Sequence, residues 1–192
     1  CSSTAAHTSR SSTNETPRSR RDIAMNATRF IILVAVLVSV PGVASVPANE
    51  TPRPMSVIAE MIDRANPGDE IMAPRGVYVG NLIIRKPIVL NGSDGVIFDG
   101  LGKGSVIEVR ADHVTIHNCT IRATGKDVTG EPAAIRVTAA HATIDSNVIE
   151  DALFGLDLRE APNAVIRNNT IACKDFDPGR RGDGIRLWRS HG

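Results

Sequence analysis

Two histidines hold the same position in successive repeats of this 192-residue chain. His113 stands directly before Val114-Thr115-Ile116, and His141 stands directly before Ala142-Thr143-Ile144. Two imidazoles one repeat apart suit a soft or borderline metal such as copper or zinc. We therefore predict a metal site formed by His113 and His141. The alternative is a pair of solvent-facing turn residues, because the next repeat carries Asn163 at this position.

A second set of chemically active side chains lies in one loop near the end of the sequence. The loop alternates acidic and basic residues and is followed by the only tryptophan of the chain. Loops that project from a regular scaffold are where such proteins place recognition surfaces. We predict a partner-binding loop here, with a solvated turn as the alternative; its residues are Asp175, Asp177, Arg180, Arg181, Asp183 and Trp188.

Catalysis on carbohydrate would require two carboxylates that face one sugar at a defined separation. Asp183 is the only acid of Gly182-Asp183-Gly184, and Asn168-Asn169-Thr170 contains none. The sequence therefore predicts no catalytic residues.

The elements that must position these residues are repeats with one pattern of apolar and polar residues. Four segments alternate an apolar, a charged and an apolar residue: Ile107-Glu108-Val109, Ile135-Arg136-Val137, Leu156-Asp157-Leu158 and Ile185-Arg186-Leu187. Strand-like alternation in repeats of 20 to 30 residues is typical of stacked β coils. We predict an all-β fold, a single-stranded right-handed parallel β-helix over residues 68–192. We expect it to be truncated at its C-terminal side, because the fourth repeat is interrupted.

Aligning the repeats predicts which side chains stack from one coil to the next. Glu108, Arg136, Asp157 and Arg186 form one outward column of alternating sign, whose exposed pairs should each contribute only about 0.2–1 kcal/mol. A second charged column contains His117, Asp145 and Arg167. A polar corner column, Cys119, Asn147 and Asn169, is predicted to form an asparagine ladder in which Cys119 takes one place.

Composition narrows the class of protein. The chain is 42% hydrophobic with a formal net charge of +1, enough for one domain with its own core. It has no basic stripe with interleaved aromatic residues, so nucleic acid is not an expected partner. Three scattered cysteines do not predict a disulfide framework.

The first third of the chain divides into three segments. Residues 1–24 are rich in Ser, Thr and Arg, and we expect them to be disordered or to precede the true start at Met25. Residues 25–48 have the layout of a secretory signal peptide, with the apolar run from Phe30 to Val40. Residues 49–67 are expected to form a linker and a short helix that covers the first coil, with Met55, Ile58 and Ile62 on one face.

Two segments are the most distinctive parts of the later repeats: Ile149-Glu150-Asp151-Ala152-Leu153-Phe154-Gly155-Leu156 and Arg181-Gly182-Asp183-Gly184-Ile185-Arg186-Leu187-Trp188. Both resemble segments of NosD, a family of periplasmic maturation proteins of nitrous oxide reductase. The resemblance extends over about residues 56–192. Family members continue through many further coils, so the chain resembles the N-terminal half.

The resemblance implies a protein that is not an enzyme by itself and that functions in the periplasm beside an ABC transporter. Family members work with the transporter's ATPase and permease in assembling the copper–sulfide centre of nitrous oxide reductase, and a copper chaperone lipoprotein supplies copper. Two other classes remain open: a secreted carbohydrate-active β-helix enzyme, either a polysaccharide lyase or a hydrolase, and an adhesin or surface-layer repeat protein.

Overall fold

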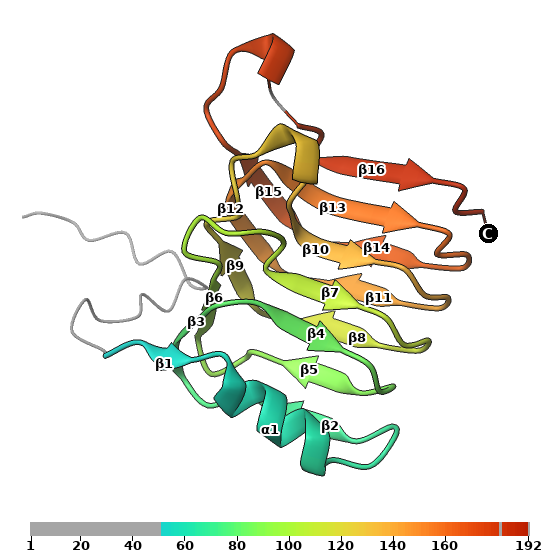
Figure 1. Cartoon of the computed structure of the whole chain (residues 1–192). Coiled ribbons are helices and arrows are strands. Elements are labelled where there is room, and N and C mark those ends of the chain that lie inside the picture. Colours follow the sequence, from blue (N-terminus) through green and yellow to red (C-terminus); the bar gives the residue numbers. More distant parts are fainter. Residues whose placement is uncertain (1–50, 181, 192) are drawn as a thin grey trace, which may run out of the picture. The chain divides into compact units, whose positions relative to one another are not determined.

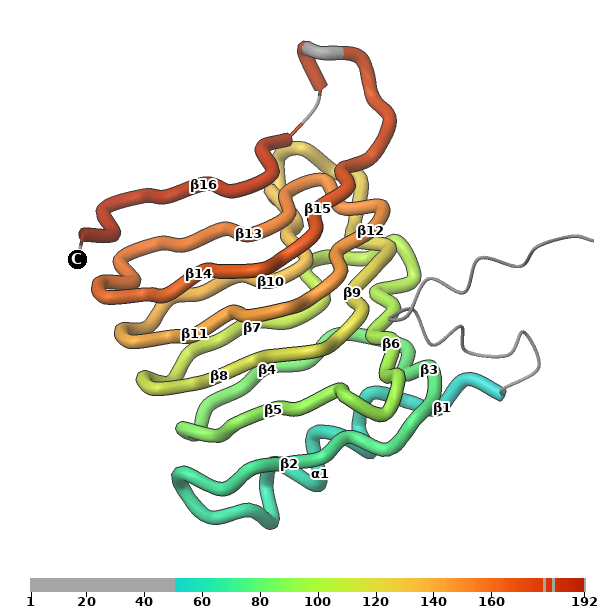
Figure 2. The backbone as a smooth tube through the Cα atoms, turned by 180° about the vertical axis from the view of Figure 1, so that it is seen from behind, coloured from blue at the N-terminus to red at the C-terminus, as the bar shows by residue number. Residues whose placement is uncertain are grey.

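The computed structural model describes residues 51–180 and 182–191. In this part of the chain the strands form three parallel sheets, one of six strands and two of five. Each coil contributes one strand to each sheet, so that the backbone climbs from coil to coil (Figures 1 and 2). The predicted parallel β-helix is confirmed. The predicted segments 1–24 and 25–48 lie outside the described residues.

Five coils follow one another between residues 70 and 188. In the first two, the strands are β2 (Glu70–Met72), β3 (Gly76–Val79), β4 (Leu82–Ile84), β5 (Val89–Asn91), β6 (Val96–Asp99) and β7 (Ile107–Val109). The third and fourth coils contain β8 (Thr115–His117), β9 (Thr120–Arg122), β10 (Ala133–Val137), β11 (Thr143–Asp145), β12 (Val148–Ala152) and β13 (Phe154–Arg159). The fifth contains β14 (Val165–Arg167), β15 (Thr170–Cys173) and β16 (Ile185–Trp188).

Alternation of side chains fills the interior of the coils with aliphatic residues. Ile116 pairs with Ile144, and Ile121 pairs with Ile149, in the registers that the sequence predicted. All four side chains are buried. Because successive residues of a strand face opposite sides of the sheet, the strand residues next to these buried side chains face outward.

The corner ladder forms as expected. Asn147 accepts a hydrogen bond from the Cys119 amide (3.0 Å) and donates from Nδ2 to the Ile116 carbonyl (3.0 Å). Asn169 accepts from the Asn147 amide (2.9 Å), so each asparagine ties its coil to the preceding one. Burial raises the pKa of the Cys119 thiol to about 12, although a hydrogen bond with the Gly92 backbone lowers it.

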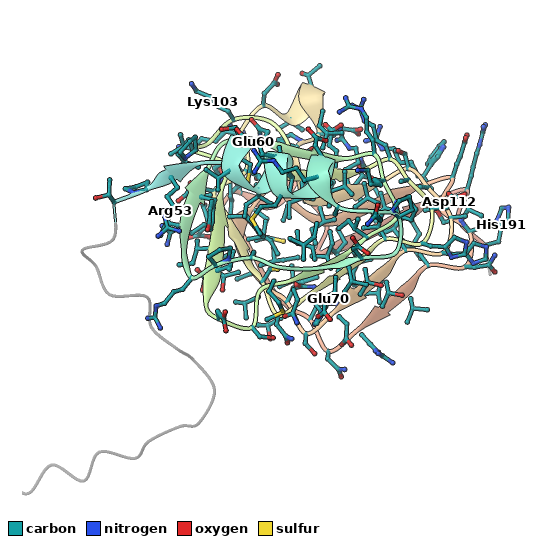
Figure 3. All side chains as sticks on the ribbon, turned by 90° about the horizontal axis from the view of Figure 1, so that it is seen from below. Arg53, Glu60, Glu70, Lys103, Asp112 and His191 are labelled. Atoms are coloured by element: carbon teal, nitrogen blue, oxygen red, sulfur yellow. The ribbon has the colours of Figure 1, made fainter. Side chains whose placement is uncertain are left out.

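A helix, α1 (Ser56–Arg64), covers the first coil and follows β1 (Arg53–Pro54), which pairs with β3. Ile58 and Ile62 are buried in the same core as the strands, so the predicted cap is confirmed. Figure 3 shows α1 from below, with Glu60 labelled on it. The Lys86 ammonium group donates to the Ile62 and Ala65 carbonyls at the end of the helix (3.0 and 2.7 Å). A cation at this position satisfies carbonyls that have no partner within the helix. No helix in the described part of the chain is long and apolar enough to span a membrane.

Two loops extend the side of the coil where the predicted loop residues lie. One joins β9 to β10 and contains the short helix η1 (Val128–Gly130), and the other joins β15 to β16 and contains η2 (Pro178–Arg180). Both loops stand out from the regular stack in Figure 1. They lie beside strands β10, β13 and β16. These strands belong to one of the two five-stranded sheets, which we call sheet C (β4, β7, β10, β13, β16).

Candidate functional site

The predicted column of alternating charges lies on the outer face of sheet C. Arg136 pairs in register with Glu108 on one side and with Asp157 on the other, and Asp157 pairs with Arg186. Parallel in-register strands place these side chains directly above one another. The column is therefore confirmed, with its members on β7, β10, β13 and β16.

Asp157 differs from the exposed column residue that the sequence predicted, because its side chain is 0% exposed. It accepts hydrogen bonds from Nε of Arg136 (3.0 Å), Nε of Arg159 (2.9 Å) and Nε of Arg186 (2.9 Å). We call Arg136, Arg159 and Arg186 the arginine cluster. The prediction of a weak, exposed ladder was wrong here, because three guanidinium groups and the η1 loop cover the carboxylate.

The η1 loop contributes the second carboxylate of the site, that of Glu131. Arg186 holds it in a forked contact, with Nη1 2.8 Å from Oε1 and Nη2 3.1 Å from Oε2, and Arg159 Nη2 donates to Oε2. Arg136 donates to the carbonyls of Gly130 and Glu131 and so fixes the end of the loop. Sequence reasoning missed Glu131 and Arg159. Glu131 lies in an irregular loop outside the aligned columns of the repeats, so no column signalled it.

The contacts keep both carboxylates ionised. Hydrogen bonds from Arg186 lower the pKa of Glu131. Burial by itself raises the pKa of Asp157, but hydrogen bonds from Arg186 and Arg136 and the nearby charges outweigh it, so the net shift is downward. The same contacts raise the pKa of Arg186. At neutral pH the site is a set of fixed charges rather than a proton donor.

A pocket of about 550 Å³ opens beside these charges. Trp188 forms one wall and is 60% exposed, while the guanidinium carbon of Arg186 lies 4.2 Å from the centre of the Phe154 ring. The pocket is lined by Glu131, Thr138, Arg159, Glu160, Arg186 and Trp188. An exposed indole beside oriented guanidinium groups can bind an acidic or aromatic ligand.

The predicted partner-binding residues end at Trp188, which is the last residue of β16 and lines this pocket. Phe176 packs on Ala133, Leu153 and Phe154, and the Arg180 guanidinium lies 5.5 Å from its ring, so part of the loop is attached to the coil. The predicted residues Asp175, Asp177 and Asp183 are on the same loop, and Arg181 lies outside the described residues. Partner binding by this loop stays a prediction.

Two glycines explain how closely the last coil approaches the preceding one. A Cβ atom on Gly155 would lie 2.3 Å from the Gly184 carbonyl oxygen, and one on Gly182 would lie 2.0 Å from that of Leu153. The Gly155 amide donates to the Asp183 carbonyl (3.1 Å) and the Leu156 amide to that of Gly184 (2.9 Å). Segments 153–159 and 182–188 are therefore neighbours in space, although they are far apart in the sequence.

The two predicted metal ligands also meet, at a corner of the coil away from this pocket's lining. His113 and His141 have left-handed backbone conformations, and their rings are stacked with centroids 4.6 Å apart and planes 1° from parallel. The lone pairs of parallel imidazoles point in parallel planes and do not converge on one ion. The described residues contain no cluster of three or more His, Cys, Asp or Glu side chains that could hold a metal ion. The metal site stays a prediction, and it requires one ring to leave the stack.

The chain is similar in sequence to known proteins over part of its length. The chain is 33% identical over 116 residues to "Probable ABC transporter binding protein NosD" of Pseudomonas aeruginosa, covering 59% of this chain and 27% of that protein. A protein of the same name from Stutzerimonas stutzeri is 29% identical over 125 residues, covering 62% of this chain and 28% of the relative. The chain is NosD-like. This confirms the resemblance seen in the sequence.

The NosD-like chain spans little more than a quarter of the length of these two relatives. A shorter Pseudomonas aeruginosa protein of the same name matches over 68 residues at 29% identity, which is 35% of this chain and 62% of that protein. No family model matches the sequence. No solved structure matches it either.

Proposed function

We propose that this NosD-like chain is part of a periplasmic accessory protein of an ABC transporter. The similarity to two proteins named as probable ABC transporter binding proteins carries this proposal. The finer proposal is that the protein acts with the transporter's ATPase and permease in maturation of the copper–sulfide centre of nitrous oxide reductase. A copper chaperone lipoprotein and nitrous oxide reductase itself are its further proposed partners.

The geometry supports a docking scaffold. Five coils are joined by in-register backbone pairing, by the asparagine ladder and by the capped first coil, so that outer side chains are held at fixed positions. Such repeat scaffolds present extended binding surfaces, with recognition in the loops that project from them. The site on sheet C, with its ionised side chains and exposed Trp188, fits that use.

The state of the carboxyl groups favours binding over glycoside hydrolysis. A glycosidase needs one carboxylic acid with a raised pKa to protonate the leaving oxygen. Glu131 and Asp157 both have lowered pKa values, and arginines contact both oxygens of each. We therefore propose a protein that is not an enzyme.

Copper coordination by His113 and His141 remains part of the proposal. The two rings are adjacent, but one of them must rotate out of the parallel stack before two nitrogens can approach one ion. A copper titration of the protein beside a His113→Ala/His141→Ala variant tests it. Weaker binding by the variant supports these ligands, and equal binding rejects them.

The maturation role is tested by deleting the gene in its native host and purifying nitrous oxide reductase. The proposal predicts a reductase that lacks its copper–sulfide centre, measured by absorption spectroscopy and copper content, and recovery when the gene is restored. A fully loaded reductase from the deletion strain would reject the role in maturation.

A further inference from the structure

Glu131 occupies the arginine cluster in the way that a bound ligand would. Its carboxylate comes from a loop 55 residues before Arg186 in the sequence, and both of its oxygens contact the Nη atoms of that arginine. Forked contact between a guanidinium group and a carboxylate is the geometry by which arginine recognises acidic ligands. The site therefore already displays a carboxylate-binding arrangement filled by the protein itself.

The two carboxylates of the site hold Arg186 differently. Asp157 is fully buried and accepts a hydrogen bond from Nε of Arg186, which fixes the direction of the guanidinium group. Glu131 accepts hydrogen bonds from the outer Nη groups, and its side chain is 40% exposed. Removing Glu131 would leave the guanidinium group oriented by Asp157, with its outer edge turned to the pocket.

Glu131 is also held in an unfavourable backbone conformation. Glu131 caps η1 with φ 47° and ψ 49°. This is the left-handed backbone conformation, which residues other than glycine and asparagine adopt less often. Hydrogen bonds from Arg136 to the carbonyls of Gly130 and Glu131 keep the loop end there. The backbone at Glu131 is therefore fixed by Arg136, whereas its carboxylate is held by Arg159 and Arg186.

The surroundings indicate the chemistry of the ligand. The pocket also holds the Glu160 carboxylate, which pairs with Arg189 at 3.5 Å. Counting every ion pair, four guanidinium groups face three carboxylates, which leaves an excess positive charge. Trp188, in register with Arg159, adds a largely exposed apolar wall. A pocket of about 550 Å³ accommodates one or two side chains. Arginine and tryptophan together are the residue types enriched at the energetic centres of protein–protein interfaces.

We propose that the outer Nη groups of Arg159 and Arg186 are a receptor for an acidic side chain of a partner protein, and that Glu131 keeps this receptor closed in the free protein. The partner's carboxylate takes the place of Glu131, and an apolar neighbour of that acidic residue packs on Trp188. This inference goes beyond the transporter proposal, because it concerns the chemistry of the contact and holds for any partner.

Exchange of one carboxylate for another conserves the ion pairs. Affinity must then come mainly from the contact with Trp188. A closed receptor binds more weakly in proportion to the fraction of molecules that are open. Opening it by Glu131→Gln should therefore strengthen binding, whereas a purely structural ion pair would give no gain in affinity when it is broken.

The sole tryptophan makes the test direct. Trp188 fluorescence of the full chain is followed during titration with the peptide acetyl-Leu-Asp-Leu-amide and with its neutral counterpart acetyl-Leu-Asn-Leu-amide. The proposal predicts saturable binding of the acidic peptide, binding about tenfold tighter in Glu131→Gln, and binding at least about tenfold weaker in Arg159→Gln. Arg167→Gln, which breaks an ion pair with Asp145 on another sheet, is the matched control and should bind like the wild type.

Circular dichroism and urea midpoints establish that each variant is folded. If Arg159→Gln is not folded, Arg159→Lys replaces it, because lysine keeps the charge but cannot bind Asp157 and Glu131 through separate nitrogens as Arg159 does. Equal responses to the two peptides, unchanged or weaker binding by Glu131→Gln, or an equal loss in Arg167→Gln would overturn the proposal. Succinate that binds as tightly as the peptide would replace the protein partner by a small dicarboxylate and so overturn it as well.

Discussion

At the scale of single residues, Asp157 joins the last three coils of sheet C through its contacts with three arginines. Asp157→Asn would remove the carboxylate charge that Arg136, Arg159 and Arg186 share, and it would leave these partly buried guanidinium groups without it. Breaking a buried ion pair from one side is strongly destabilising. We expect a loss of about 3 kcal/mol in the free energy of unfolding, measured by urea denaturation.

Glu60→Gln is the matched control for Asp157→Asn. Glu60 forms an exposed pair with Arg64 one turn away on α1, so its loss should change the free energy of unfolding by less than about 0.5 kcal/mol. Similar losses in the two variants would contradict the distinction between the buried and the exposed carboxylates.

The lowered pKa values of Asp157 and Glu131 predict a dependence of stability on pH. Below their ordinary values of 3.8 and 4.5, the unfolded state binds more protons than the folded one. The stability that these groups contribute is therefore complete above about pH 5 and is lost as the pH falls through the lowered values. Urea midpoints from pH 7 to pH 2 should fall in this acidic range, and less steeply in Asp157→Asn. A pH profile unchanged by that substitution would count against the ion-pair network.

Residue types alone predicted the column but not its burial. Alternating signs at matched positions located Glu108, Arg136, Asp157 and Arg186, because period-2 strands in stacked repeats fix the register. They did not locate Glu131, whose contact with Arg186 depends on how an irregular loop folds back. The same limit applies to the ring orientation of His113 and His141, which a shared column does not determine.

At the scale of elements, Gly155 controls how β13 and β16 meet. Gly155→Ala would place a methyl group against the Gly184 carbonyl and push the two strands apart, which should cost about 1–3 kcal/mol. We expect faster hydrogen exchange of β16 amides as well as a lower urea midpoint. Gly184→Ala is the control, because the nearest atom to its Cβ would be 4.0 Å away. Equal exchange rates in the two variants would contradict this account of the strand contact.

The elements themselves were largely predictable. The helix, the strand pattern and the asparagine ladder follow from local periodicity and from repeated polar corners. The loops around η1 and η2 do not repeat, and their course is set by contacts between distant segments, such as Phe176 on Phe154. The candidate site is built mainly from such contacts, so that its outline required the structure.

At the scale of the whole molecule, the apolar end of the fifth coil predicts self-association of a polypeptide with this sequence. Ile185, Leu187 and Val165 are exposed there, with Leu187 at 60%, and an open pocket of about 630 Å³ adjoins them. Unpaired strand edges and exposed apolar side chains promote edge-to-edge contact. Light scattering of purified residues 51–192 should show species larger than a monomer, and a monodisperse monomer would contradict this.

The central claim is that the protein carrying this chain works with an ABC transporter. The most direct measurement is affinity purification of the tagged full-length protein from detergent-solubilised membranes of its native host, with a tagged unrelated periplasmic protein as the control. The account predicts that the transporter's permease and ATPase co-purify with it in fixed proportion, as quantified by mass spectrometry. Recovery of both subunits only at the level of the control would contradict it.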